Sequence, residues 1–145
     1  MQQALNDGVL SAMSQATDAR LAAQDLARQL LHPHLGLVLF FCSAEYNLQE
    51  LAQALEQGFG GIRLVGCTSA GEITPQGYGR NCVTALGFDH RHFSIATGLI
   101  DEMEHFSLID AQQMVERLVG TCRSNTLAPI KGHSFALTLL CLLYT

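Results

Sequence analysis

The sequence has few charged side chains, and lysine is nearly missing. Charged residues make up 14% of the 145 residues, against roughly 25% in an average globular chain. Lys131 is the only lysine, the net charge is −5, and there is no run of basic residues. Nucleic-acid binding depends on Lys and Arg side chains that neutralise phosphates. We therefore expect no nucleic-acid partner.

No apolar run in the sequence is long enough to cross a membrane. The longest, Leu35–Cys42 and Phe135–Tyr144, fall far short of the ~18 residues that a span requires. Asp7 lies early in the chain and no apolar segment follows Met1, so the N-terminus does not resemble a secretory signal peptide. We expect a cytoplasmic protein without a membrane partner.

The cysteines do not form a recognisable pairing pattern. There are five, an odd number, and no C-x-x-C pair occurs, which excludes the usual zinc-knuckle and dithiol redox motifs. An odd number of cysteines without paired motifs is typical of proteins in a reducing compartment. Cys42, Cys82 and Cys141 lie in apolar, strand-like runs, where a thiol usually acts as a small hydrophobic group.

Helical periodicity is present in three segments, each preceded by a residue that can cap a helix. Thr17 or Asp18 can cap the first segment, and Asn47 and Ser107 can cap the others. Apolar residues recur behind each cap at intervals of three and four. The predicted helices lie near residues 18–31, 47–57 and 108–119.

Apolar runs between these segments predict strands. Gly36–Phe41 and Ile62–Val65 flank the second helix, so they form a βαβ unit with parallel strands and a right-handed crossover. Asn81–Phe88 and Phe93–Leu99 predict a hairpin, and Phe135–Leu140 predicts a last strand. The expected fold is α/β, with a mixed β-sheet built from the βαβ unit plus a hairpin and with helices packed on the sheet.

This pattern divides the chain into an N-terminal segment, 1–17, an α/β domain, 18–140, and a tail, 141–145. The apolar tail follows strand-like sequence directly, and the strand order is short for a finished sheet. We therefore expect an incomplete domain, with a natural C-terminal strand as the alternative. Low charge and open strand edges also predict a homo-oligomer.

Two segments follow the carboxyl ends of the predicted parallel strands, Cys42–Tyr46 and the turn-rich Gly66–Gly79. Ligands of α/β sheets bind at this edge. The second segment lacks the spacing of a phosphate-binding loop or a nucleophile elbow. Its hydroxyl, thiol and carboxylate groups suit a small polar or zwitterionic ligand, and a purely structural connection is the alternative. The candidate ligand-binding residues are Ser43, Cys67, Thr68, Ser69, Gly71 and Glu72.

Three stretches resemble the N-terminal part of the FIST sensory domain: Leu37–Ser43, Gly66–Ile73 and Val83–Phe88. The sequence Gly-Cys-Thr-Ser-Ala-Gly-Glu-Ile at 66–73 is the most specific, and the resemblance extends over roughly 35–140. It implies a ligand-binding input module of bacterial signal transduction. The chain is also similar to haem-binding nitric-oxide sensors, which implies haem as a cofactor and a histidine kinase as a partner. An amino-acid-type ligand without haem is the alternative.

Imidazole is a common axial ligand of haem iron, and the chain has six histidines. If the strand at 81–88 runs antiparallel to the one at 62–65, the turn after it lies at the amino edge of the parallel pair. His90 and His92 would then approach His32 and His34, with His133 entering from the same side and His105 alone near the Gly-rich segment. The two His-x-His pairs could also hold a transition metal, and turn histidines without any ligand are the remaining alternative. The candidate haem-iron ligands are His105, His32, His34, His90 and His92.

Catalysis would require an activated nucleophile, for which Cys67 is the one credible group. It lies near Glu72 in the sequence, and His105 could act as its base. The topology would place His105 near the same segment, but the sequence has no motif that fixes a Cys–His pair. We expect a binding domain and not an enzyme, with a thiol-dependent reaction at Cys67 as the alternative of another class.

Overall fold

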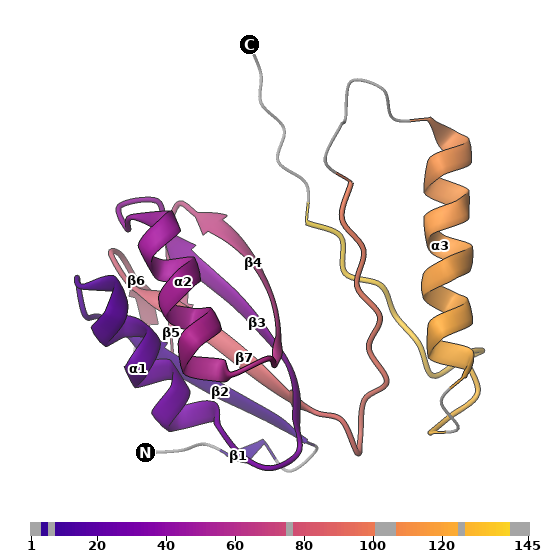
Figure 1. Cartoon of the computed structure of the whole chain (residues 1–145), viewed down its shortest axis with the longest axis horizontal. Helices are drawn as coiled ribbons and strands as arrows, with labels where there is room; N and C mark the ends of the chain where they lie inside the picture. The colour runs from indigo at the N-terminus through magenta and orange to yellow at the C-terminus, as the bar shows by residue number, and fades with distance from the viewer. Residues whose placement is uncertain (1–3, 6–7, 75–76, 101–106, 125–126, 140–145) are drawn as a thin grey trace. The chain divides into compact units, whose positions relative to one another are not determined.

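The chain alternates strands with helices and divides into two units, residues 1–93 and 94–145, each described here by itself. The computed structural model describes residues 4–5, 8–74, 77–100, 107–124 and 127–139. The second unit holds α3 (Leu108–Arg123). The first unit contains, in chain order, β1 (Ala4–Leu5), β2 (Val9–Ser14), α1 (Ala19–Leu30), β3 (Leu35–Ser43), α2 (Leu48–Phe59), β4 (Arg63–Ser69), β5 (Glu72–Thr74), β6 (Gly77–Gly79) and β7 (Val83–Asp89) (Figure 1).

The helices begin at the capping residues that the sequence predicts. The Asp18 side chain accepts from two backbone N–H groups of the first turn of α1, and Asn47 does the same for one group of α2. Ser107 and Asp110 form a reciprocal capping box at the start of α3. Gly60, with φ of 53°, ends α2 in the left-handed conformation that glycine adopts without strain.

The strands β1, β2, β7, β3 and β4 form one five-stranded sheet in that order. β3 and β4 are parallel, with Leu37 opposite Arg63 and Ser43 opposite Ser69, and the other neighbours in the sheet are antiparallel. The predicted mixed α/β sheet with its parallel βαβ pair is confirmed. A separate two-stranded hairpin pairs β5 with β6.

The core of the first unit lies between the sheet and the two helices α1 and α2, which run side by side (Figure 1). Helical spacing places the leucines of each helix on one face, and strand alternation supplies small apolar groups from the sheet. Each fully buried leucine contributes roughly 1.5–3 kcal/mol. The largest fully buried members are Leu26, Leu30, Val38, Cys42, Leu51, Leu55 and Val83.

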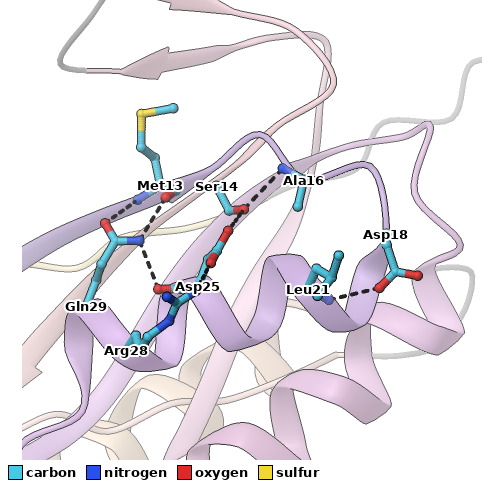
Figure 2. Close-up of polar contacts among 8 residues, drawn as sticks. All are labelled: Met13, Ser14, Ala16, Asp18, Leu21, Asp25, Arg28 and Gln29. Atoms are coloured by element: carbon cyan, nitrogen blue, oxygen red, sulfur yellow. Dashed lines mark hydrogen bonds and ion pairs between the residues drawn. The ribbon is translucent and has the colours of Figure 1, made fainter.

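Polar contacts fasten α1 to the neighbouring strand β2 (Figure 2). The Gln29 amide nitrogen donates to the Met13 carbonyl at 2.9 Å, and the Met13 N–H donates to the Gln29 carbonyl oxygen at 3.4 Å. One turn away, the Ser14 hydroxyl donates to Asp25 at 2.8 Å, and Asp25 also pairs with Arg28. These bonds fix how α1 lies across the strand.

The hairpin predicted from Asn81–Phe88 and Phe93–Leu99 is wrong. The first segment forms β7, but residues 93–99 are not a strand. β7 pairs with β2 on one side and with β3 on the other, not with β4. Both of its edges are therefore occupied, and no edge remains for residues 93–99.

The Gly-rich segment is not the open loop that the sequence predicts. β4 continues to Ser69, because Gly66–Ser69 pairs with Phe40–Ser43 of β3. Glu72 then opens the β5–β6 hairpin. Several candidate ligand-binding residues consequently lie on strands or in a short turn.

In the second unit, α3 lies along the extended segment that precedes it. The backbone at Gly98 lies against Met114 and Leu118, and the Cys122 thiol is 3.6 Å from the Ser94 carbonyl oxygen. The strand predicted at Phe135–Leu140 is not formed at residues 135–139, and residue 140 lies outside the described part of the chain. None of the helices described is both long and apolar enough to cross a membrane.

Candidate ligand-binding site

The carboxyl ends of β3 and β4 meet at Ser43 and Ser69, which lie opposite each other in the parallel register. The Ser43 N–H donates to the Cys82 carbonyl oxygen at 3.0 Å, and its hydroxyl accepts from the Glu45 N–H at 3.3 Å. The segment that leads into β7 thus closes on the same edge. Two serine hydroxyls are held there by rigid strands.

A tight turn after β4 brings Glu72 back to Ser69. The Ser69 hydroxyl donates to Glu72 Oε1 at 2.8 Å and accepts from the Gly71 N–H at 3.3 Å. The Tyr78 hydroxyl donates to the Ala70 carbonyl at 3.0 Å and closes over Gly71, where an added Cβ would be 1.9 Å from the Tyr78 oxygen. Glycine at 71 therefore allows Tyr78 to seal the turn.

Glu72 is the centre of a buried polar cluster, which we call the Glu72 cluster: Glu72, Cys42, Tyr46 and Cys82. Glu72 is 2% exposed, and its Oε2 accepts from the Cys82 thiol at 3.1 Å. The Tyr46 hydroxyl donates to the Ala16 carbonyl at 2.6 Å. No Lys, Arg or His among the described residues forms an ion pair with Glu72. The hydrogen-bonding partners of Glu72 among the described residues are the neutral Ser69 hydroxyl and Cys82 thiol.

Burial keeps the other members of the cluster protonated. Burial, then the hydrogen bond to Glu72 and its charge, raise the pKa of Cys82 to about 11. The pKa of Tyr46 is raised to about 12, first by burial and then by the charges of Cys82, Cys42 and Glu72. Burial and the charge of Glu72 also raise the pKa of Cys42. Near neutral pH these three groups are neutral, and Cys82 donates to Glu72 while Tyr46 donates to the Ala16 carbonyl.

The six predicted residues lie at the same edge but differ in exposure. Ser43 and Glu72 are buried and Thr68 is exposed. Strand alternation places Thr68 on the sheet face opposite Cys67 and Ser69. Cys67, Ser69 and Gly71 are half-buried. The structure thus joins Ser69 to Glu72 directly, and it places Thr68 apart from that contact.

The sequence places the Cys42–Tyr46 segment at this edge but does not predict that Cys42, Tyr46 and Cys82 surround Glu72. Their apolar, strand-like surroundings in the sequence predict that Cys42 and Cys82 are small hydrophobic groups. One signal was available: a strand antiparallel to β3 must begin where β3 ends, which places the residue before β7 at this edge. Cys82 follows from that rule once the pairing of β3 with β7 is known.

At the opposite edge, histidines gather around the amino end of β3. The ring centres of His34 and His90 are 5.6 Å apart, and those of His32 and His34 are 6.5 Å apart. The ring of His92 lies against Gly8. The predicted approach of the two His-x-His pairs is therefore confirmed for His34 and His90.

The two other histidines of the sequence are His105 and His133. His105 lies outside the described residues, and His133 is exposed in the second unit. Within the described part of the chain, no three or more His, Cys, Asp or Glu side chains are arranged to hold a metal ion.

Comparison with known proteins gives one match. No curated protein and no solved structure matched the chain. The family model described as the FIST N domain matches residues 36–144, which include β3, the Gly66–Glu72 segment, β7 and α3. This match covers most of the chain. The protein belongs to the FIST N domain family and is a small-ligand-binding sensory domain of signal transduction.

Proposed function

We propose that this domain senses a small molecule carrying a cationic amine, such as an amino acid, and that Glu72 binds the amine. The main support is the burial of Glu72. Its side chain is 2% exposed, and its carboxylate accepts from two neutral donors, the Ser69 hydroxyl and the Cys82 thiol. Ser43, Cys67 and Gly71 complete the proposed ligand edge, and Thr68 lies on the opposite face of β4.

The free energy of burial favours a cationic ligand. A carboxylate removed from water without a counter-ion costs several kcal/mol. Each Glu72 oxygen has one neutral donor, although a carboxylate offers about four acceptor positions in all. An ammonium group would add both charge and donors where the described residues supply neutral donors alone.

Because Glu72 is buried, a ligand can bind it only with a conformational change. Glu72 is the first residue of β5, so an amine reaches it when the β5–β6 hairpin moves away from the edge. That movement breaks the bond between Tyr78 and the Ala70 carbonyl. A ligand that favours the moved hairpin would shift the population toward it, which is the behaviour required of a sensor.

The finer expectations, haem, nitric-oxide sensing and regulation of a histidine kinase, rest on the family resemblance. The described histidines give haem less support than Glu72 gives to an amine. His90 and His92 are exposed, and the His34 ring is packed edge-on against His90, with 77° between the ring planes. We therefore place the amine ligand ahead of haem.

Calorimetry and thermal unfolding of the purified chain would test the amine proposal. The panel consists of amino acids and simple amines, each compared with its N-acetyl derivative, which has no positive charge. At least one amine should bind and raise Tm, and its N-acetyl derivative should not. A panel without any binder, or equal binding of the acetylated forms, would overturn the proposal.

Glu72→Gln is the decisive variant, because it keeps the shape of the side chain and removes the charge. We expect it to fold with an equal or higher Tm and to lose the ligand-induced shift. Glu56→Gln, at an exposed acidic position on α2, is the matched control and should keep that shift. Retained binding in Glu72→Gln would contradict the assignment of the amine to Glu72.

The same preparation separates amine from haem. The chain would be expressed with haem supplied and its absorption spectrum recorded. We expect no Soret band. A Soret band that disappears in one His→Ala variant at position 32, 34, 90, 92, 105 or 133 would replace the amine with haem and identify the axial ligand.

A further inference from the structure

We propose that His34 and His90 form a two-imidazole site for a divalent transition-metal cation at the amino edge of the sheet. The sequence predicts that the two His-x-His motifs approach each other and could hold a transition metal. The structure brings together one histidine from each motif, with ring centres 5.6 Å apart. This edge lies at the opposite end of β3 from Glu72, so the inference is independent of the amine ligand.

The separation of the rings fits a shared ion. An imidazole nitrogen binds Zn²⁺ at about 2.0–2.1 Å, which places the centres of two rings on one ion roughly 4.5–5.5 Å apart. His34 and His90 are within a few tenths of an ångström of that range and need small side-chain rotations. His32 and His34, at 6.5 Å, would have to move further.

The backbone holds the two histidines in place before any ion arrives. The His90 N–H donates to the His34 carbonyl at 2.9 Å, which joins the segment after α1 to the end of β7. A Cβ on Gly36 would be 2.9 Å from the Cβ of His90, so glycine lets His90 pack closely. His32 is a positioning residue, since its Nδ1 accepts from the His34 N–H at 3.3 Å.

The charges nearby permit a cation. Arg91 is next to His90 in sequence, but its guanidinium pairs with the buried carboxylate of Asp89 at 2.6 Å. The positive charge is thus neutralised within the turn. Neutral imidazoles suit Zn²⁺, Ni²⁺ and Cu²⁺. Water would complete the coordination, because the described residues offer no group of three or more ligating side chains.

Calorimetric titration of the chain with Ni²⁺ tests the site. His34→Ala and His90→Ala should each weaken binding about tenfold or more, because each removes one of two protein ligands. His92→Ala, a histidine of the same turn, is the matched control and should bind as the parent does. Unchanged affinity in either of the first two variants, or an equal loss in His92→Ala, would overturn the proposal.

A second measurement locates the ion without any substitution. Substoichiometric Cu²⁺ broadens NMR signals close to its binding site. We expect the amide and ring signals of His34 and His90 to broaden first. If signals around the half-buried Cys67 broadened first, a thiol site would replace the imidazole site.

Discussion

The thiol of Cys82 donates a hydrogen bond to Glu72, with Sγ 3.1 Å from Oε2. Cys82 is fully buried, so water cannot take over either role. The bond requires that the thiol keep its proton beside a carboxylate. This requirement makes the stability of the first unit dependent on pH in the alkaline range.

We expect the free energy of unfolding to fall as pH rises from about 9 to about 11. The pKa of Cys82 is raised from its usual 9.0 to about 11. In that window the unfolded chain releases the thiol proton while the folded chain retains it, so the contribution is complete below pH 9 and lost above pH 11. Its size is on the order of 2 kcal/mol. Urea unfolding at a series of pH values would measure it.

Cys82→Ser separates this titration from the hydrogen bond. Serine still donates to Glu72 but does not titrate in this range. The decline above pH 9 should therefore become smaller, leaving the contribution of Cys42, whose pKa is also raised from its usual 9.0. A decline should remain above pH 10, where Tyr46, with its pKa raised to about 12, begins to contribute. An unchanged pH profile in the serine variant would contradict the assignment.

A second pH dependence is expected in acid from the turn after β7. The Arg91 side chain donates to Asp89, which holds the pKa of that carboxyl well below its usual 3.8. This contribution is present above pH 4 and is lost as pH falls below it. Arg91→Ala should move the acid-unfolding midpoint, followed by circular dichroism, to higher pH. Arg20→Ala, at an exposed position on α1, should not move it.

Two glycines at the ligand edge should differ in their tolerance of alanine. A Cβ at Gly66 would be 2.3 Å from the Phe40 carbonyl oxygen, which is backbone and cannot move aside. At Gly71 the obstacle is the end of the Tyr78 side chain. We expect Gly66→Ala to cost about 3 kcal/mol and Gly71→Ala about 1 kcal/mol in urea unfolding.

A double-mutant cycle checks the reason for that difference. In a Tyr78→Ala background the cost of Gly71→Ala should shrink, because the obstructing side chain is gone. In the same background the cost of Gly66→Ala should stay the same. A Gly66→Ala variant as stable as Gly71→Ala would show that the β3–β4 pairing can adjust.

Thiol labelling distinguishes a binding domain from a thiol-dependent enzyme. Cys42 and Cys82 are buried and their pKa values are raised, so both should react with dithionitrobenzoate only after the protein unfolds. The half-buried Cys67 should react in the folded protein at pH 7, no faster than a thiol of the unfolded chain. Labelling of Cys67 many times faster than that would favour catalysis.

The sequence was sufficient where the decisive interactions are local. Asp18, Asn47 and Ser107 cap helices through bonds to residues two or three positions away, so the three helices could be predicted. The parallel pairing of β3 and β4 followed from the single helix between them. The meeting of Ser43 and Ser69 at one edge followed from that pairing.

Interactions between distant segments could not be predicted in the same way. Residues 93–99 have the composition of a strand. They could pair with β7 only if its edge were free, and β2 occupies that edge. β2 itself has weak periodicity, and its partner β7 lies far along the chain. The role of Cys82 depends on the same pairing, so the sequence alone predicts no more than a small hydrophobic group at Cys82.

The placement of β2 has a consequence for how the chain folds during synthesis. Val9 of β2 lies opposite Phe88 of β7, whereas β3 and β4 are joined through α2 alone. Contacts between distant residues form more slowly than local ones, and nascent chains emerge N-terminus first. We expect β3, α2 and β4 to assemble on the ribosome before β7 has been synthesised. Until then β2 has no β7 to pair with. A strand that is synthesised early, β2, is thus among the last to join the sheet, and until then chaperones can bind it.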